Sequence, residues 1–388
     1  MRFSEKQKEF WNHADRRWNI KQGAARSGKT YLDYFLIPRR IRACTGSGLI
    51  VLIGNTRGTL NRNILEPMRN IWGTALVGNI GNDGTVMLFG RLCHAMGADK
   101  ASQAARLQGA GIEYCYGDEI TTWNEDVFTM LKSRLDKPNS RFDGTCNPDS
   151  PNHWLKRFLE SDADIFQQHY TIDDNPFNSP EFVENLKREY WGTVFYRRFI
   201  LGEWTLAQGL VYPMFSPEKH VAQFTEQPGA AYYISVDYGT VNPTSMGLWC
   251  VAEGTAHRIR EYYHDSRKTA RQLTDEEYYA RLEQLAGELD IRAVVVDPSA
   301  ASFIAVIRRH GRFTVRKAKN QVLDGIRLTG GYLQNGRLRF DPCCRDTIRE
   351  FGAYCWDDTA EEDRVIKQND HAMDDIRYFC STILCRLL

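Results

Sequence analysis

The sequence has almost no net charge, no apolar run long enough to cross a bilayer and no secretory signal at its start. Its 50 Lys and Arg residues nearly balance 49 Asp and Glu residues, which leaves a formal charge of +1. The overall charge therefore does not indicate a nucleic-acid partner. No stretch approaches the roughly 20 consecutive apolar residues of a transmembrane helix, so we expect no membrane association. The first residues, MRFSEK, lack the apolar segment of a secretory signal.

Paired metal-binding cysteines are also missing. The chain has 10 cysteines, none of them spaced as C-x-x-C, and the adjacent Cys343 and Cys344 do not have the spacing of a zinc half-site. Scattered cysteines without a framework favour reduced thiols in a cytosolic compartment.

The length and the pattern of the chain indicate more than one domain. At 388 residues the chain exceeds the usual domain size of about 100–200 residues, and two domains are expected. Residues 206–228 contain Gly and Pro with little periodicity, which is typical of a linker. We predict an α/β protein with domains at 1–205 and 229–388. Any contact with DNA must come from local basic clusters, which otherwise are solvated faces, and the candidates are Arg197 with Arg198, Arg308 with Arg309, and Arg316 with Lys317 and Lys319.

Residues 23–30, GAARSGKT, fit the phosphate-binding pattern G-x-x-x-x-G-K-[ST]. In this pattern backbone N–H groups surround the phosphates, the lysine reaches the β and γ oxygens, and the final hydroxyl holds Mg²⁺. A strand-like run at 18–21 precedes the loop and apolar residues at helical spacing follow it. We predict an ATP and Mg²⁺ site, and the alternative is a Gly/Ala-rich turn with an incidental lysine. The predicted nucleotide-binding residues of this loop are Gly23, Arg26, Ser27, Gly28, Lys29 and Thr30, with Thr30 also a metal ligand.

A pair of acids follows a probable strand at 112–117. An ATPase of this class needs a carboxylate at a strand end to hold Mg²⁺ and a neighbouring base to orient the attacking water. Asp118 is predicted in the first role and Glu119 in the second. The alternative is that the two acids only begin a turn or cap a helix.

Three further polar residues fit the same predicted site. Gln7 lies where its amide would contact an adenine edge, although an exposed first helix accounts for it as well. Thr145 and Asn147 follow a strand that begins near residue 142, and they are candidates for sensing the γ-phosphate.

The second half of the sequence shows strands at 232–236, 246–251 and 257–263, a helix at 275–289 and a strand at 293–296. This order is that of an RNase H-like nuclease fold, which gathers carboxylates from its first strand, its fourth strand and a late helix. Two divalent ions, Mg²⁺ or Mn²⁺, roughly 3.5–4 Å apart would there activate water and stabilise the leaving oxygen of a phosphodiester. Asp237 and Asp297 are the first two predicted ligands, and acids at a strand end that only form turns are the alternative. The run Asn369–Tyr378 offers three acids for the third position.

Taken together, several motifs resemble those of the large terminase subunits of tailed bacteriophages, the motors that pump DNA into procapsids. They are AARSGKT, YGDE, TCNP followed by PNHWLK, and YRRFILGEW. The run DHAMDDIRY also resembles the D-H-A-x-D-A-x-R-Y signature of terminase nuclease domains. In that signature the acid three residues after His is the metal ligand, which implies Asp374 here, with Asp370 as the alternative. Asp375 stands where the family commonly has alanine.

The resemblance implies a P-loop ATPase domain followed by the nuclease domain, in a protein that moves double-stranded DNA and cuts it. It implies three partners besides DNA, namely the portal protein of the procapsid, a small terminase subunit and further copies of the chain in a ring, all in the host cell cytoplasm. Arg26 and Arg106 are the cationic candidates for stabilising the transition state, and the choice between them stays open. Lys317 and Lys319 are candidates for phosphate contacts. The rival hypotheses are a helicase-nuclease of DNA repair and a motor whose second half is only a docking module for DNA or portal.

Overall fold

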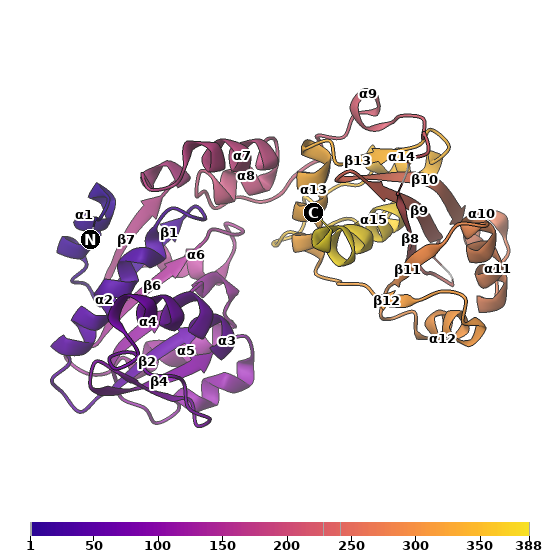
Figure 1. Cartoon of the computed structure of the whole chain (residues 1–388). Coiled ribbons are helices and arrows are strands. Elements are labelled where there is room, and N and C mark those ends of the chain that lie inside the picture. Colours follow the sequence, from indigo (N-terminus) through magenta and orange to yellow (C-terminus); the bar gives the residue numbers. More distant parts are fainter. Residues whose placement is uncertain (1, 228, 241, 388) are drawn as a thin grey trace. The chain divides into compact units, whose positions relative to one another are not determined.

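The computed structural model describes residues 2–227, 229–240 and 242–387. The chain divides into two compact units, Met1–Asn185 with Phe195–Leu206 and Leu186–Val194 with Ala207–Leu388. Each unit is built around its own β-sheet (Figure 1). The mixed α/β class expected from the sequence is thereby confirmed.

The sheet of the first unit has the strand order β3-β4-β2-β5-β6-β1-β7. Its pairs are parallel except for β3 and β4, which form an antiparallel pair. β2 reads LIVLIG and is buried beyond its first residue, as expected for a strand covered on both faces. The strands are β1 (Trp18–Gly23), β2 (Leu49–Gly54), β3 (Thr85–Leu88), β4 (Arg91–Gly97), β5 (Ile112–Gly117), β6 (Arg141–Cys146) and β7 (Ile165–Tyr170).

Two helices of the first unit begin at clear side-chain caps. Ser4 caps α1 (Glu5–His13) in a capping box with Gln7, and Asn124 caps α5 (Glu125–Arg134). Between β2 and β3 a helix runs through α3 (Arg57–Leu60), a π-helical turn η1 (Asn61–Leu65) and α4 (Glu66–Trp72). The sequence did not predict this helix. The other helical segments are α2 (Lys29–Ala43), η2 (Ala101–Leu107), η3 (Ile120–Thr122), α6 (Trp154–Leu159), η4 (Ile172–Asp174), α7 (Pro180–Tyr190), which the division between the units splits after Asn185, and α8 (Val194–Phe199), of which all but Val194 belong to the first unit.

The sheet of the second unit has the order β12-β11-β8-β9-β10-β13. β8, β9 and β10 are antiparallel neighbours, whereas β11 pairs in parallel with both β8 and β12. The strands are β8 (Ala231–Asp237), β9 (Thr244–Ala252), β10 (Thr255–His264), β11 (Ile291–Val296), β12 (Val315–Lys317) and β13 (Leu338–Phe340).

The last long helix of the second unit, α15, packs against β8 and β9 and is almost wholly buried. This placement brings the carboxyl end of β8 close to the start of α15. The helices are α9 (Pro217–His220), α10 (Ser266–Thr269), α11 (Asp275–Ala286), α12 (Ala301–His310), α13 (Val322–Gln334), α14 (Arg345–Phe351) and α15 (His371–Thr382), followed by η5 (Leu384–Arg386).

Much of the stretch that composition indicates as a linker packs against the second unit. The N–H of Val211 donates to the carbonyl of Tyr354 at 2.9 Å. The buried His220 contacts the carbonyl of Leu333 through its Nε2 at 3.0 Å. The last residue of that stretch, Pro228, lies outside the described residues.

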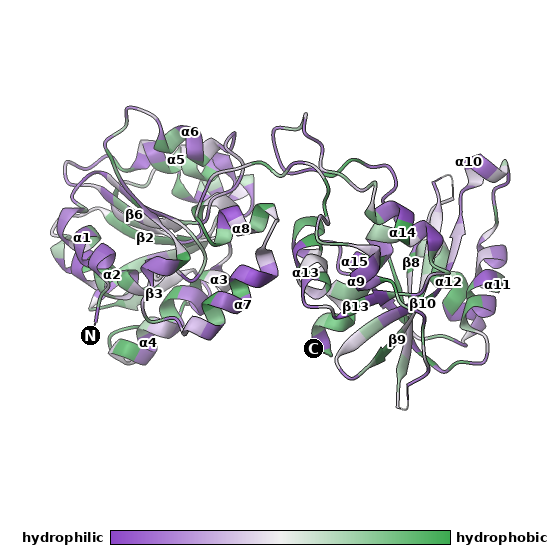
Figure 2. Ribbon diagram, turned by 90° about the horizontal axis from the view of Figure 1, so that it is seen from above, coloured by the Kyte–Doolittle hydropathy of each residue, from purple (hydrophilic) through white to green (hydrophobic). Residues whose placement is uncertain are grey.

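The apolar core of each unit lies between its sheet and the covering helices. Figure 2 shows hydrophobic residues concentrated on the strands and the inner helix faces, with hydrophilic residues outside. Within the described ranges, we find no helix with both the length and the apolar character needed to span a bilayer.

Candidate functional site

The loop between β1 and α2 adopts a conformation that depends on two glycines. A Cβ on Gly23 would lie 2.0 Å from the carbonyl oxygen of Tyr170, so only glycine allows β1 and β7 to approach here. Gly28, with φ of +86°, precedes the first residue of α2. Arg26 also has a positive φ, 55°, which is uncommon for a residue other than glycine. Such outliers gather at ligand sites because surrounding contacts hold them.

Lys29 is buried at the start of α2 among uncharged acceptors. Its Nζ donates to the carbonyl oxygens of Gly23 (2.8 Å) and Ala24 (2.5 Å), to Ser27 Oγ (3.2 Å) and to Asn147 Oδ1 (3.1 Å). Burial is the main reason that the pKa of Lys29 falls to about 8. A phosphate would supply the negative charge that this buried ammonium lacks, so the loop fits a nucleotide.

Asp118 and Glu119 follow β5 beside this loop. Asp118 accepts hydrogen bonds from the Thr145 hydroxyl and from Asn63 Nδ2, both at 3.1 Å. Burial first, and then the neighbouring Glu119 carboxylate, raise the pKa of Asp118 to about 6. Both causes penalise a negative charge, and a divalent cation would relieve them. Glu119 is in the left-handed region, with φ of 51°.

A cavity of about 550 Å³ brings most of these residues together. Two predicted residues lie beside it: Gly23, whose carbonyl accepts from Lys29, and Gln7, which borders a neighbouring cavity of about 340 Å³. Both polar atoms of the Gln7 amide are engaged, Oε1 by the N–H of Ser4 and Nε2 by the carbonyl of Gly28, each at 2.8 Å. Arg106 is exposed on η2, away from the lining of the larger cavity. The predicted residues that line the larger cavity are Arg26, Ser27, Gly28, Lys29, Thr30, Asp118, Glu119, Thr145 and Asn147.

Several lining residues were missed by the sequence reasoning. Arg62 and Asn63 come from the π-helical turn η1, for which the sequence carries no periodic signal. Such turns are frequent at functional sites. Asn175 and Asn178 come from the loop after β7, where the run NPFNSP is at least typical of a tight turn. The remaining missed residues are Ala25, Tyr31, Tyr34, Pro67 and Cys146.

A second cavity, of about 540 Å³, lies where the end of β8 meets the start of α15. The acids that line it include Asp237, Asp370 and Asp374, together with His371 and Lys367. Asp237 Oδ2 contacts His371 Nδ1 at 2.8 Å. Burial is the first reason that the pKa of Asp237 rises to about 7, and the charges of Asp374 and Asp375 contribute although His371 opposes the rise. The cavity therefore concentrates negative charge that a cation would stabilise.

Basic side chains neutralise the other acids of this cavity. Asp374 pairs with Arg377 at 2.9 Å and with Lys367 at 3.3 Å. Lys367 also pairs with Asp370, at 3.3 Å, and Asp370 stands at the N-cap of α15 without a side-chain capping bond.

Asp297, at the end of β11, is not among the residues that line the cavity. Its carboxylate accepts from the N–H of Ser299 (2.7 Å), Asn320 Nδ2 (2.9 Å) and Tyr378 Oη (2.7 Å). Burial opposes the effect, but the bonds from Ser299 and Tyr378 hold the pKa of Asp297 below its usual value. Across the described ranges, no three His, Cys, Asp or Glu side chains lie close enough to hold a metal ion as they stand. In this arrangement both oxygens of the Asp374 carboxylate face basic side chains, Lys367 and Arg377.

The third acid of that run, Asp375, has a different environment. It is fully buried and pairs with the fully buried Arg258, and it also accepts from the hydroxyls of Ser235, at 2.8 Å, and Ser245. Asp375 therefore faces a structural arginine and does not line the cavity.

Comparisons with known proteins agree across the chain. The family model described as "Terminase large subunit, T4likevirus-type, N-terminal" matches residues 22–218. A structure of the large terminase from a thermophilic bacteriophage is 34% identical, covers 99% of this chain and 100% of its own, and has a TM-score of 0.89. The same thermophilic-phage protein in complex with ADP matches with a TM-score of 0.86 over 98% of this chain and 100% of its own, also at 34% identity. The large terminase subunit of Escherichia phage T5 is 23% identical over 300 residues, 72% of this chain and 67% of that protein.

Proposed function

The chain belongs to the family of phage large terminase subunits, and we propose that it hydrolyses ATP to move double-stranded DNA into a procapsid and cuts concatemeric DNA. The observation that carries the ATPase part is Lys29, buried in the first cavity with only neutral acceptors and facing Asp118 and Glu119. The large terminase of the thermophilic phage has been solved with ADP and with ATP-γ-S, which supports a nucleotide at the matching place here.

In the proposed mechanism each residue of the first cavity has a separate role in ATP hydrolysis. Lys29 would exchange its carbonyl partners for phosphate oxygens, and Thr30 and Asp118 would hold Mg²⁺. The ion would neutralise charge on the phosphates as the bond to the leaving oxygen breaks. Glu119 orients the attacking water. Thr145, already bonded to Asp118, and Asn147, already bonded to Lys29, sense loss of the γ-phosphate.

The smaller cavity beside the loop suits the base. Tyr31 and Phe177 border it with Gln7 and Gly28, and both aromatic rings are partly exposed, Tyr31 by 38% and Phe177 by 55%. Aromatic faces stack on purines. Gln7 holds the loop through Gly28 and retains one amide hydrogen for the base edge. Arg26 lines the phosphate cavity, which favours it over Arg106 for a role within one subunit. Arg106, exposed on η2, would act on a neighbouring subunit of the ring.

We assign the nuclease activity to the second cavity. The strand order β12-β11-β8-β9-β10 supports an RNase H-like fold for this unit, after the P-loop ATPase unit. Asp237, Asp374 and Asp297 would hold divalent ions, Mg²⁺ or Mn²⁺, and such ions would activate water for attack on a phosphodiester. One observation favours the rival docking module, namely that Asp374 and Asp297 are already engaged by basic or donor groups.

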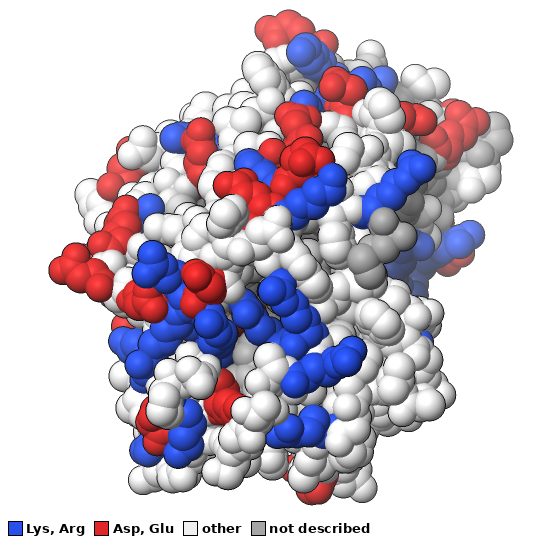
Figure 3. All heavy atoms as spheres, turned by 90° about the vertical axis from the view of Figure 1, so that its left-hand side faces the viewer, with Lys and Arg blue, Asp and Glu red and all other residues white. Residues whose placement is uncertain are grey.

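Partners follow from the family. Large terminases act on DNA together with a portal protein and a small subunit, and we propose the same partners, a homo-oligomeric ring and the host cytoplasm for this chain. Figure 3 shows Lys and Arg side chains gathered in a patch on one face. Such a patch gives DNA contact a local basis despite the formal charge of +1.

ATP hydrolysis by the purified chain tests the motor assignment. We expect Lys29→Ala and Glu119→Gln to lower kcat by at least 100-fold, because one loses the phosphate contact and the other the base. Glu125→Gln, an exposed acid in the first turn of α5, is the matched control and should retain wild-type activity. Equal activity of all variants would contradict the assignment.

A further inference from the structure

Two asparagine side chains from the loop after β7 converge on a single carbonyl of the glycine-rich loop. Asn175 Nδ2 donates to the carbonyl oxygen of Arg26 at 2.9 Å, and Asn178 Nδ2 donates to the same oxygen at 3.0 Å. Asn175 Nδ2 also lies 3.1 Å from Asn178 Oδ1. The Asn175 Oδ1 accepts the N–H of Phe177 at 3.2 Å, which fixes the amide in a local turn. Contacts within their own loop therefore orient the two amides toward the Arg26 carbonyl.

The residue that they hold has an unusual backbone. Arg26 has a φ of 55°, a conformation that residues other than glycine rarely adopt unless neighbouring contacts maintain it. Its exposed side chain belongs to the lining of the phosphate cavity. The next residue toward the N-terminus, Ala25, donates its N–H to the carbonyl of Phe199 at 3.2 Å. The loop is thus held at Arg26 by side chains and beside it by backbone.

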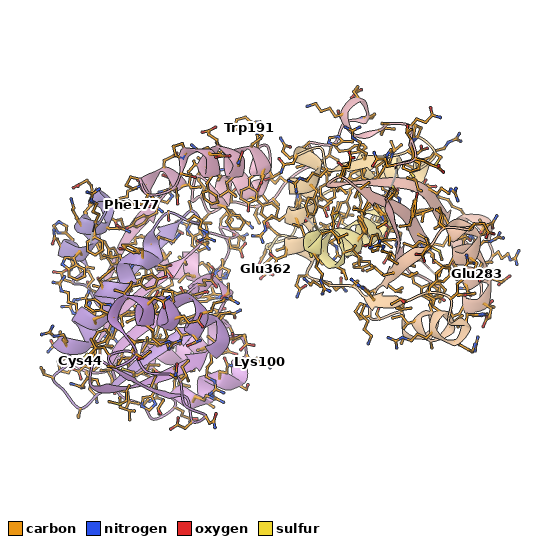
Figure 4. All side chains as sticks on the ribbon, viewed as in Figure 1. Cys44, Lys100, Phe177, Trp191, Glu283 and Glu362 are labelled. Carbon is orange, nitrogen blue, oxygen red and sulfur yellow. The ribbon has the colours of Figure 1, made fainter. Side chains whose placement is uncertain are left out.

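We propose that Asn175 and Asn178 are positioning residues for the Arg26 guanidinium. By saturating the Arg26 carbonyl they keep the residue in its left-handed conformation, with the guanidinium at the cavity where charge develops on the transferred phosphoryl group. The inference rests on the proposed ATPase function and deepens it. Phe177, labelled in Figure 4, stands between the two asparagines in the sequence and borders the base cavity together with Asn175, so the loop that borders the base cavity is also the loop that holds Arg26.

This arrangement predicts a separation between ground-state and transition-state binding. In the proposed site ADP would be held mainly by Lys29 and by the N–H groups at the start of α2, beyond Arg26, and these contacts do not require the Arg26 guanidinium. A transition-state analogue carries the extra charge that the guanidinium would meet. Loss of the two amides should therefore weaken the analogue more than ADP and lower kcat more than it raises KM.

The test compares Asn175→Ala/Asn178→Ala, Arg26→Ala and the variant that combines all three substitutions. Dissociation constants of ADP and of ADP with aluminium fluoride, both with Mg²⁺, are measured beside steady-state ATP hydrolysis. We expect the double variant to bind ADP within about threefold of wild type and the analogue at least about tenfold more weakly. In the Arg26→Ala background the same two substitutions should weaken the analogue by less than about twofold, because coupled residues are not additive. Asn178→Ser, which keeps a donor, should recover part of the analogue affinity, and Asn12→Ala, at an exposed position of α1, is the matched control.

Two results would overturn the inference while leaving the ATPase assignment intact. One is equal weakening of ADP and the analogue, which would make the amides a general support of the loop. The other is a loss of analogue affinity on Asn175→Ala/Asn178→Ala that is as large in the Arg26→Ala background as in the wild-type background. Failure of the wild-type chain to bind ADP would instead overturn the proposed nucleotide site and, with it, the role of Asn175 and Asn178.

Discussion

Removal of the Asp375 carboxylate should destabilise the second unit strongly. Asp375 and Arg258 both have 0% of their side chains exposed and form an ion pair. Arg258 also lies so close to β9 that a Cβ on Gly247 would be 2.2 Å from its Nη1. In Asp375→Ala the guanidinium loses its close partner, and the contacts that remain are the longer approach to Glu261, at 3.9 Å, and the hydroxyl of Ser245, at 3.3 Å. Breaking a buried pair in this way costs about 3–5 kcal/mol.

This loss of free energy of unfolding should appear as a measurable fall in the Tm of the second unit. A unit of this size loses about 2–4 °C of Tm for each kcal/mol, so Asp375→Ala should lower the transition of the second unit by roughly 6–20 °C. Calorimetry of the whole chain separates the transitions of the two units. Arg258→Met/Asp375→Ala removes both charges, and its loss should be less than half that of the single variant. Asp324→Ala, which breaks the exposed pair with Arg327 at 3.3 Å, is the control and should cost no more than about 1 kcal/mol.

A shift of less than about 2 °C in Asp375→Ala would refute the buried-pair argument, since such a value corresponds to only about 1 kcal/mol. Equal losses in the single and double variants would also refute it, because the unpaired charge would then not be the cause. At temperatures well below the unfolding transition, Asp375→Ala should retain any nuclease activity, because Asp375 does not line the second cavity.

Three further predictions concern the nucleotide cavity. The pKa of Lys29 is about 8 in the free protein, and a bound phosphate raises this pKa, so ADP binding at pH 8.5 should take up protons. Calorimetry in two buffers of different ionisation enthalpy measures the proton uptake. Uptake that persists in Lys29→Ala would contradict the prediction. Gly23→Ala should abolish ADP binding because the new Cβ would lie 2.0 Å from a backbone oxygen. The control Gly58→Ala, whose Cβ would lie 3.6 Å from its nearest neighbour, should be tolerated. A Gly23→Ala protein that binds ADP normally would refute the close approach of β1 and β7 at this residue. Phe177→Ala should weaken ADP by about 1–3 kcal/mol but leave tripolyphosphate unchanged in competition assays, and equal weakening of both would exclude a stacking role.

Strong local patterns made most of the fold predictable. The runs at 18–21 and 112–117 correspond to β1 and β5, and those at 232–236, 246–251, 257–263 and 293–296 correspond to β8, β9, β10 and β11. The helix expected at 275–289 is α11, Asp275–Ala286. The helix through η1 was not predicted, because a π-helical turn breaks the 3.6-residue repeat by which helices are recognised. The strand β7 was also missed, since its IFQQHY sequence lies at a sheet edge and has little apolar character.

The candidate sites, too, were predictable where they depend on local sequence and not where they depend on the fold. A motif with fixed spacing identifies Lys29 and Thr30 because the chemistry depends on neighbours in sequence. Asn63, Asn175 and Asn178 reach the cavity from segments far along the chain, so only the fold brings them to the loop. The partner of Asp375 could not be read from sequence either, because Arg258 is 117 residues away. Asp375, which departs from the family signature, has its physical explanation in that pairing.

The central claim is tested most directly by cleavage of supercoiled plasmid in Mn²⁺ by the purified chain, beside Asp237→Ala, Asp374→Ala and the control Asp324→Ala. We expect nicking and linearisation by the wild-type chain and the control, and loss of both in the two cavity variants. Cleavage that survives in Asp374→Ala, or its absence from a wild-type chain that hydrolyses ATP, would contradict the assignment of the nuclease to the second cavity.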